Sequence, residues 1–126
     1  MAKIRVLVAD DNINFLQLAQ LALGTSDYEV FTATDGQDGF DLARKMKPDI
    51  ILMDVMMPRV SGLEMMRMLL ADEELRNIPV LVMSASHFDP STEMVFKQES
   101  NIKGFLQKPC PVQVLQDEIA KALKNK

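Results

Sequence analysis

Two kinds of segment alternate along the chain. Short, almost uninterrupted apolar runs predict buried strands at Ile4–Ala9, Glu29–Ala33, Ile50–Asp54, Val80–Ser84 and Gly104–Gln107. Between them, apolar residues recur at helical spacing, as in the first such segment with Phe15, Leu16, Leu18, Ala19 and Ala22. Strands that are apolar throughout and separated by helices are typical of a parallel sheet covered on both faces. The pattern therefore predicts an α/β fold with a five-stranded, doubly wound sheet.

Glycine and proline mark several helix ends in this pattern. Gly24 follows the first helix as a stop, and Pro111 suits the first turn of the last one. That last helix has Val112, Leu115, Ile119 and Leu123 on one face. Pro90 predicts a late start for the fourth helix, and Asn101, which tolerates the left-handed conformation, stands near its end.

Composition and charge narrow the class of protein. The 126 residues suit a single domain, 1–126, and a formal net charge of −4 argues against nucleic acid or an anionic membrane as partner. No apolar stretch is long enough to cross a bilayer and no signal peptide is evident, which predicts a cytoplasmic protein. The single cysteine, Cys110, excludes an internal disulfide, and we interpret both it and His87 as structural or surface residues.

Polar side chains stand at the carboxyl ends of four predicted strands. Asp10 and Asp11 follow the first, Asp54 ends the third, Ser84 ends the fourth and Lys108 follows the fifth. Ligands of doubly wound folds bind beyond these strand ends, so we expect the five residues to share one crevice. Asp54 is the most telling, because four apolar residues precede it and an unpaired buried carboxylate is costly.

Three neighbouring carboxylates need a compensating charge. Two unit charges about 4 Å apart repel by on the order of 4 kcal/mol at an effective dielectric of 20. Carboxylates and a backbone carbonyl suit a hard divalent ion such as Mg²⁺. With Lys108 and Ser84 added, the set favours phosphoryl transfer to an aspartate, which needs positioning and charge neutralisation but no general base.

These residues and their order resemble the receiver domain of two-component response regulators. The resemblance extends over essentially all 126 residues and includes Met57-Pro58 with Gly62, Ser84-Ala85 and Lys108-Pro109. It implies a flavodoxin-like sheet with strand order 2-1-3-4-5. It also implies a signalling phosphoacceptor rather than an enzyme, phosphorylated by a sensor histidine kinase or a histidine phosphotransfer protein and acting on a downstream protein target. Such a protein would be a monomer or a phosphorylation-dependent dimer.

The resemblance assigns a role to each site residue. Asp54 would accept the phosphoryl group, Asp11 and Asp54 would bind Mg²⁺ or Mn²⁺ directly, and Asp10 would act through a water. Met56 would add its backbone carbonyl as a metal ligand. Ser84 and Lys108 would contact the phosphate, and no organic cofactor is implied. The bond before Pro109 would be cis.

The resemblance also implies a switch and a lifetime for the phosphoryl group. Ser84 would move toward the phosphate and Phe105 would rotate inward, reshaping the surface of the fourth helix, fifth strand and fifth helix. Met56 and Ser86 occupy positions that tune phosphate loss. Because the Met56 side chain cannot hydrogen-bond an attacking water, we predict slow autodephosphorylation.

Other interpretations compete with this one. Asp10 and Asp11 could simply cap the first helix. A flavodoxin-like cofactor carrier would need a phosphate cradle where Asp10 and Asp11 stand. A phosphatase with an aspartyl-phosphate intermediate would usually have an acid in place of Met56. A phosphorylation-independent interaction module on a receiver fold remains the main alternative.

Overall fold

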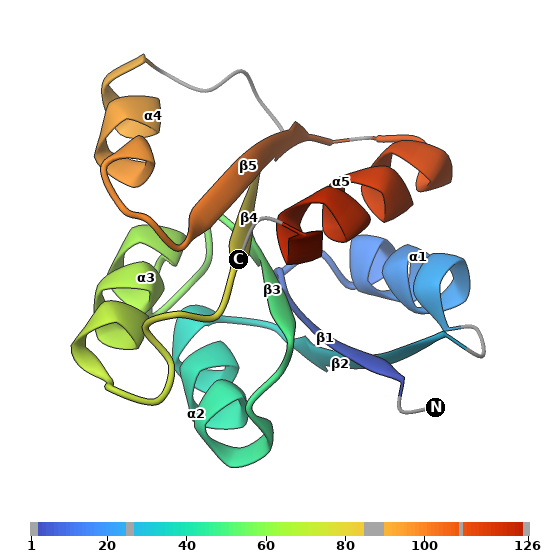
Figure 1. Cartoon of the computed structure of the whole chain (residues 1–126), viewed down its shortest axis with the longest axis horizontal. Coiled ribbons are helices and arrows are strands. Elements are labelled where there is room, and N and C mark those ends of the chain that lie inside the picture. Colours follow the sequence, from blue (N-terminus) through green and yellow to red (C-terminus); the bar gives the residue numbers. More distant parts are fainter. Residues whose placement is uncertain (1–2, 25–26, 85–89, 109, 125–126) are drawn as a thin grey trace.

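The computed structural model describes residues 3–24, 27–84, 90–108 and 110–124, and five strands alternate with five helices along them (Figure 1). The strands are β1 (Ile4–Ala9), β2 (Tyr28–Ala33), β3 (Ile50–Asp54), β4 (Val80–Ser84) and β5 (Ile102–Gln107). The helices are α1 (Ile13–Leu23), α2 (Gly36–Met46), α3 (Gly62–Ala71), α4 (Pro90–Lys97) and α5 (Val112–Lys124). In these ranges, no helix combines the length and the apolar character that crossing a membrane would require.

All strand pairs are parallel, and the sheet has the order β2-β1-β3-β4-β5. The predicted doubly wound sheet and its strand order are thereby confirmed. The order reverses between β1 and β3, which places the carboxyl ends of these two strands side by side. Ala9 lies opposite Met53 in this pairing, so the residues that follow, Asp10 and Asp54, leave the sheet at the same edge.

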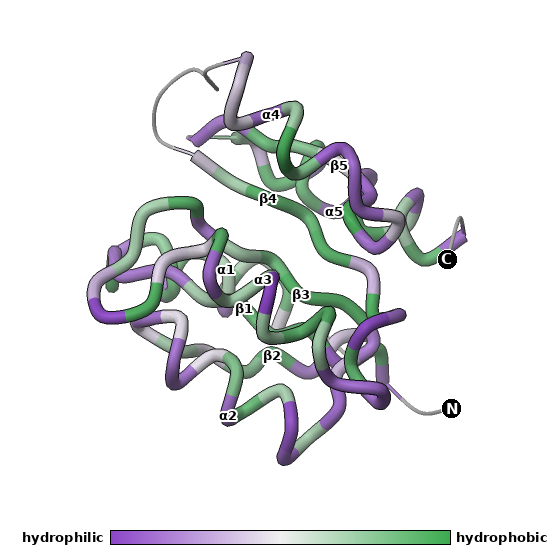
Figure 2. The backbone as a smooth tube through the Cα atoms, turned by 90° about the vertical axis from the view of Figure 1, so that its left-hand side faces the viewer, coloured by the Kyte–Doolittle hydropathy of each residue, from purple (hydrophilic) through white to green (hydrophobic). Residues whose placement is uncertain are grey.

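Alternate residues of each strand enter two separate cores, because successive side chains of a strand point to opposite faces. Val6, Val8 and Leu52 pack under α1 and α5, whereas Leu7 and Met53 pack under α2, α3 and α4. Figure 1 shows the two helical layers on either side of the sheet, and Figure 2 shows β3 and β4 as largely hydrophobic. Burial on both faces explains why these strands contain so few polar residues.

Most element boundaries agree with the sequence, and the exceptions have local causes. β2 begins one residue early, at Tyr28, and β5 begins two residues early, at Ile102. The register shifts between Val80 and Leu81, which pair with Ile102 and Gly104, so Lys103 is the extra residue of a bulge. A bulge interrupts the alternation of side chains, which hides the start of β5 from the sequence pattern.

Two predicted helix faces need correction. Leu18 in α1 and Val112 in α5 were expected to face the core, but they are 47% and 41% exposed. In α5 the buried residue near the end is Ala122 rather than a larger side chain. Each helix has more apolar residues than one of its faces can bury, so some of them stay exposed. Helical spacing alone does not predict which ones these are.

Helix ends also differ in detail from the sequence prediction. The described part of α4 runs from Pro90 to Lys97 and the segment before it lies outside the described residues, so the late start stays a prediction. In contrast, α5 begins at Val112, one residue after Pro111. The carbonyl of Pro111 accepts the first helical hydrogen bond, from the Leu115 amide at 3.1 Å. Asn101 is buried and is not among the residues with positive φ, so it does not adopt the left-handed conformation that its side chain would tolerate.

Candidate functional site

Three aspartates converge where β1 and β3 end. One carboxylate oxygen each from Asp10, Asp11 and Asp54 lies within 4.8 Å of the other two. Asp10 is fully buried and Asp54 is 6% exposed, whereas Asp11 reaches the surface. The cluster is therefore anchored in the protein on one side and open to solvent on the other, as expected from the sequence.

The backbone explains why these carboxylates are fixed. The Asp10 amide donates to the Ala33 carbonyl at 3.0 Å, and the Val55 amide donates to the Met83 carbonyl at 3.0 Å. Parallel pairing thus continues one residue past β1 and one past β3. Asp10 and Asp54 leave the sheet from hydrogen-bonded, well-defined positions.

Asn12, rather than Asp10 or Asp11, caps helix α1. Its side chain accepts a hydrogen bond from the Phe15 amide at 3.2 Å. The Asp10 carboxylate instead accepts from the Asn12 amide at 2.9 Å with one oxygen, which leaves the other oxygen for the cluster. The capping interpretation of the two aspartates is therefore wrong, because Asn12 performs that role.

Lys108 brings a positive charge to the aspartates. Its Nζ atom lies 2.5 Å from Asp10 Oδ2 and 3.7 Å from Asp54 Oδ1. The Lys108 side chain is only 10% exposed, and its ammonium group lies 4.8 Å from the centre of the Phe15 ring. The lysine is therefore held in the site by a carboxylate and an aromatic face and is not a solvated surface charge.

The carboxyl of Asp54 has a pKa raised to about 6. Burial is the main cause, since it disfavours the charged form, and the neighbouring Asp10 and Asp11 carboxylates add repulsion. Lys108 and the Val55 amide act in the opposite direction but do not compensate fully. The arrangement therefore favours a further cation beside Asp54, and three carboxylates are the donor set that a hard divalent ion prefers.

Ser84 and Phe105 share one face of the sheet on neighbouring strands. Ser84 ends β4, is 8% exposed, and its carbonyl accepts from the Lys108 amide at 2.8 Å. Phe105 in β5 is paired with Val82, two residues before Ser84, so the two side chains point to the same side. The Lys97 ammonium group of α4 lies 5.9 Å from the centre of the Phe105 ring. The strand ends thus join Ser84 to Lys108 through a backbone hydrogen bond, and the Phe105 ring lies farther along the face that the Ser84 side chain shares.

Met56 lies in the loop that follows β3, with its side chain 74% exposed. A cavity of about 300 Å³ separates this loop from α4, lined among others by Met56, Thr92 and Val95. The expectations for the Pro109 peptide bond and for Ser86 and His87 lie outside the described residues.

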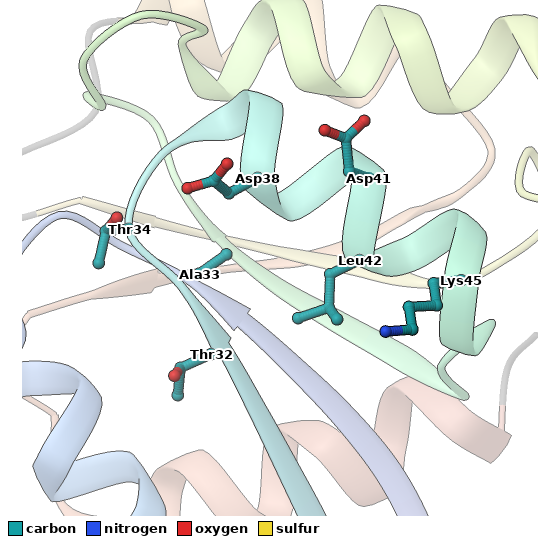
Figure 3. A pocket seen from close by; sticks show the side chains of 7 residues that line it. All are labelled: Thr32, Ala33, Thr34, Asp38, Asp41, Leu42 and Lys45. Atoms are coloured by element: carbon teal, nitrogen blue, oxygen red, sulfur yellow. The ribbon is translucent and has the colours of Figure 1, made fainter.

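A larger hollow of about 390 Å³ lies away from the aspartate cluster, between the end of β2 and α2. Figure 3 shows Thr32 on the strand, Thr34 just after its end, and Asp38, Asp41 and Lys45 projecting from the helix. Its walls combine carboxylates, a lysine and threonine side chains without a convergent group of ligands.

Sequence reasoning missed the contacts of two residues, and one of them, Phe15, lies against Lys108 of the site. Phe15 was expected only as a core residue, and Arg59 was not considered. Arg59 contacts Asp35 and Asp38 at the start of α2. The contact of Lys108 with the Phe15 ring joins segments that are far apart in the sequence, and the spacing of the residues does not predict it.

Comparison with known proteins agrees with this fold. The sequence model of the response regulator receiver domain matches residues 6–120. The chain therefore belongs to the response regulator receiver domain family, which makes it a signalling domain of two-component systems and not a classical enzyme.

Individual relatives show the same relationship. The polar-differentiation response regulators DivK of Brucella anthropi and Brucella ovis are 35% and 36% identical over 107 residues, which is 85% of this chain and 85% of each relative. The chemotaxis protein CheY4 of Vibrio cholerae superposes with a TM-score of 0.88 at 28% identity, covering 96% of this chain and 99% of CheY4. A LuxO receiver domain of Vibrio parahaemolyticus shares the fold, with a TM-score of 0.86 at 23% identity. The superposition covers 98% of this chain and 92% of that domain.

Proposed function

We propose that the protein is a phosphoacceptor receiver whose Asp54 takes a phosphoryl group from a phosphohistidine. The observation that carries the proposal is the cluster of Asp10, Asp11 and Asp54 with Lys108 at the carboxyl edge of the sheet. An Asp54 oxygen would attack phosphorus while the bond from phosphorus to the donor imidazole breaks, and that imidazole would leave with a proton. The product is an acyl phosphate on Asp54.

The chain's own groups would stabilise this transfer. Asp11, Asp54 and the Met56 carbonyl would hold Mg²⁺ or Mn²⁺, with Asp10 acting through a water, and the ion would neutralise charge on the phosphoryl oxygens. Lys108 would shift its contact from the carboxylates toward the incoming phosphate, and Ser84 would donate its hydroxyl to it. Each contact matters most as charge develops on the transferring group.

The proposed output is a change of surface around α4, β5 and α5. A phosphoryl group adds roughly −1.5 to −2 charge at Asp54, which would attract the Ser84 hydroxyl and allow Phe105 to turn inward. Met94 and Val95 on α4 and Val114 on α5 are exposed apolar residues that a downstream protein could cover. We also propose that residues 1–126 act as one receiver domain, because both cores share a single sheet.

The test is incubation of the protein with acetyl phosphate and Mg²⁺, followed by measurement of the intact mass. We expect one Mg²⁺-dependent phosphoryl adduct on the wild type and none on Asp54→Asn. Asp41→Asn, which changes an exposed carboxylate of α2, is the matched control and should be modified like the wild type. A folded wild type without an adduct would instead favour a phosphorylation-independent interaction module.

The same experiment tests the lifetime of the phosphoryl group. After removal of acetyl phosphate, the adduct should decay slowly, because the Met56 side chain offers no hydrogen bond to an attacking water. Met56→Asn should shorten the lifetime, since an amide can orient that water. A wild-type half-life of only seconds would contradict this part of the proposal.

A further inference from the structure

The loop after β3 contains a sharp and unusual turn at Arg59. The Val60 amide donates to the Pro58 carbonyl at 2.7 Å, which closes a three-residue turn around Arg59. Arg59 has a φ of 62°, and Lys47 is the other non-glycine residue with positive φ in the described ranges. This combination defines a classic γ-turn, a rare and strained conformation. Such strain persists only where the surroundings hold it in place.

The side chain of Arg59 supplies one restraint. Its Nε and Nη2 atoms lie 2.9 and 2.8 Å from Asp35 Oδ2, and Nη2 also lies 3.0 Å from Asp38 Oδ1. Asp35 is 6% exposed and is the N-cap of α2, where its other oxygen accepts from the Asp38 amide at 2.8 Å. Mainly this amide, with help from Arg59, holds the pKa of the Asp35 carboxyl below its usual value. The guanidinium is thus tied to a rigid, ionised anchor.

The backbone of the loop is restrained at both ends. The Gly36 amide donates to the Val60 carbonyl at 2.9 Å, and a Cβ atom on Gly36 would lie 2.2 Å from that oxygen. The Gly62 amide donates back to the Val55 carbonyl at 3.0 Å. Residues 55–62 therefore form a closed loop held against the start of α2, and Met56 is the second residue of this segment.

We infer that Arg59 is a positioning residue for the cation site. Its pairing with Asp35 and Asp38 holds the strained turn and so fixes the loop that presents the Met56 carbonyl beside Asp54. The inference rests on the proposed function, in which that carbonyl is a metal ligand. Without the pairing, the turn relaxes, the carbonyl spends less time in place, and Mg²⁺ binds more weakly.

The test is calorimetric titration of Mg²⁺ into cation-free protein. For Arg59→Met we expect the Kd to rise about fivefold, less than for loss of a residue bonded directly to a metal ligand because Arg59 acts through the loop. Arg59→Lys should recover part of the affinity, because it keeps the charge but loses the fork of donors. Arg44→Met is the matched control, since Arg44 is similarly exposed but lies in the last turn of α2, where it pairs with Asp72 at the end of α3. Its Kd should equal that of the wild type.

A double substitution identifies the partners. Asp35→Asn with Asp38→Asn keeps an N-cap, because Asn caps helices as well as Asp, but removes both charges. This variant should weaken Mg²⁺ binding as much as Arg59→Met does. Adding Arg59→Met to it should cause little further loss, because the pair no longer exists. Fully additive losses would overturn the assignment.

The outcomes separate this inference from the proposed function. If the wild type neither binds Mg²⁺ nor accepts a phosphoryl group, both fail. If the wild type does both and Arg59→Met binds Mg²⁺ like Arg44→Met, the inference alone is overturned. Should Arg59→Met fail to fold, the Asp35→Asn with Asp38→Asn variant replaces it, because it removes the charged partners and leaves Arg59 itself unchanged. A wild-type Kd in that variant would equally overturn the inference.

Discussion

At the scale of single residues, Asp54 links chemistry to stability. Its carboxyl has a pKa of 3.8 as an ordinary group and about 6 in the folded protein without a cation. A raised pKa means that the folded state prefers the protonated form of the carboxyl. The protonated Asp54 therefore stabilises the fold fully below pH 3.8, and this contribution is lost as the pH rises through about 6. The loss at neutral pH is on the order of 3 kcal/mol. An ionised Asp54 carboxylate at neutral pH therefore lowers the stability of the cation-free fold.

The raised pKa of Asp54 leads to a pH-dependent prediction for Asp54→Asn. In cation-free buffer at neutral pH, the variant should have a higher free energy of unfolding than the wild type, because it removes the repelled charge. The difference should shrink as the pH falls through about 6, where the wild-type carboxyl becomes protonated. Urea unfolding in the presence of a chelator measures it, with Asp41→Asn as control. A difference that does not change with pH would show that charge is not its cause.

At the scale of elements, the junction of β3 and α3 is set by a glycine. Gly62 is the first residue of α3, and a Cβ atom there would lie 2.3 Å from the Asp54 carbonyl oxygen and 3.0 Å from Val55 Cα. Real Cβ atoms do not approach backbone this closely, so any side chain must push α3 away from β3. The absence of a side chain at Gly62 therefore helps to set the backbone that carries Asp54.

We predict that Gly62→Ala destabilises the protein by about 2–4 kcal/mol. Alanine normally stabilises a helix relative to glycine, so a loss of stability in this variant would come from the clash of the Cβ atom with the backbone. Gly104→Ala is the control, because its Cβ atom would mainly meet the flexible end of the Leu81 side chain, at 3.1 Å. It should cost less than about 1 kcal/mol. Thermal and urea unfolding compare the two, and similar losses would refute the argument.

At the scale of the whole molecule, the proposed switch connects the aspartate site to α4. Ser84 and Phe105 lie on the same face of β4 and β5, and Lys97 places the charge of α4 near the Phe105 ring. Lys97 also pairs with Glu93 at 2.9 Å within α4. A rotation of the ring would change this contact, so in the proposed switch a phosphoryl group on Asp54 would alter the surface of α4 through two neighbouring strands.

The prediction concerns Ser84→Ala. The variant should still acquire a phosphoryl group on Asp54, because the nucleophile and the cation ligands are intact. The Phe105 ring resonances should shift on phosphorylation of the wild type and shift much less in the variant. Aromatic carbon–proton spectra report this, and Phe105→Leu assigns the signals. Equal shifts in both proteins would exclude Ser84 from the switch.

Much of the fold was predictable because apolar runs and helical spacing are local properties. The five strands, the parallel sheet and the placement of Asp10, Asp11, Asp54 and Lys108 at one edge follow from that pattern. The start of β5 was not predictable from this pattern, because Lys103 forms a bulge that interrupts the alternation of side chains. The exposure of Leu18 and Val112 was not predictable either, because spacing identifies an apolar face without saying how wide a neighbour will cover it.

The sequence alone thus determined that Asp10, Asp11, Asp54 and Lys108 meet at one edge of the sheet, since parallel strands bring their carboxyl ends together. Only the tertiary structure decided how they are held. Lys108 lies closer to Asp10, which is 98 positions away in the sequence, than to Asp54. Arg59, in a strained turn, contacts Asp35, which is 24 positions away. Such contacts depend on distances between folded segments, and no local pattern in the chain encodes them.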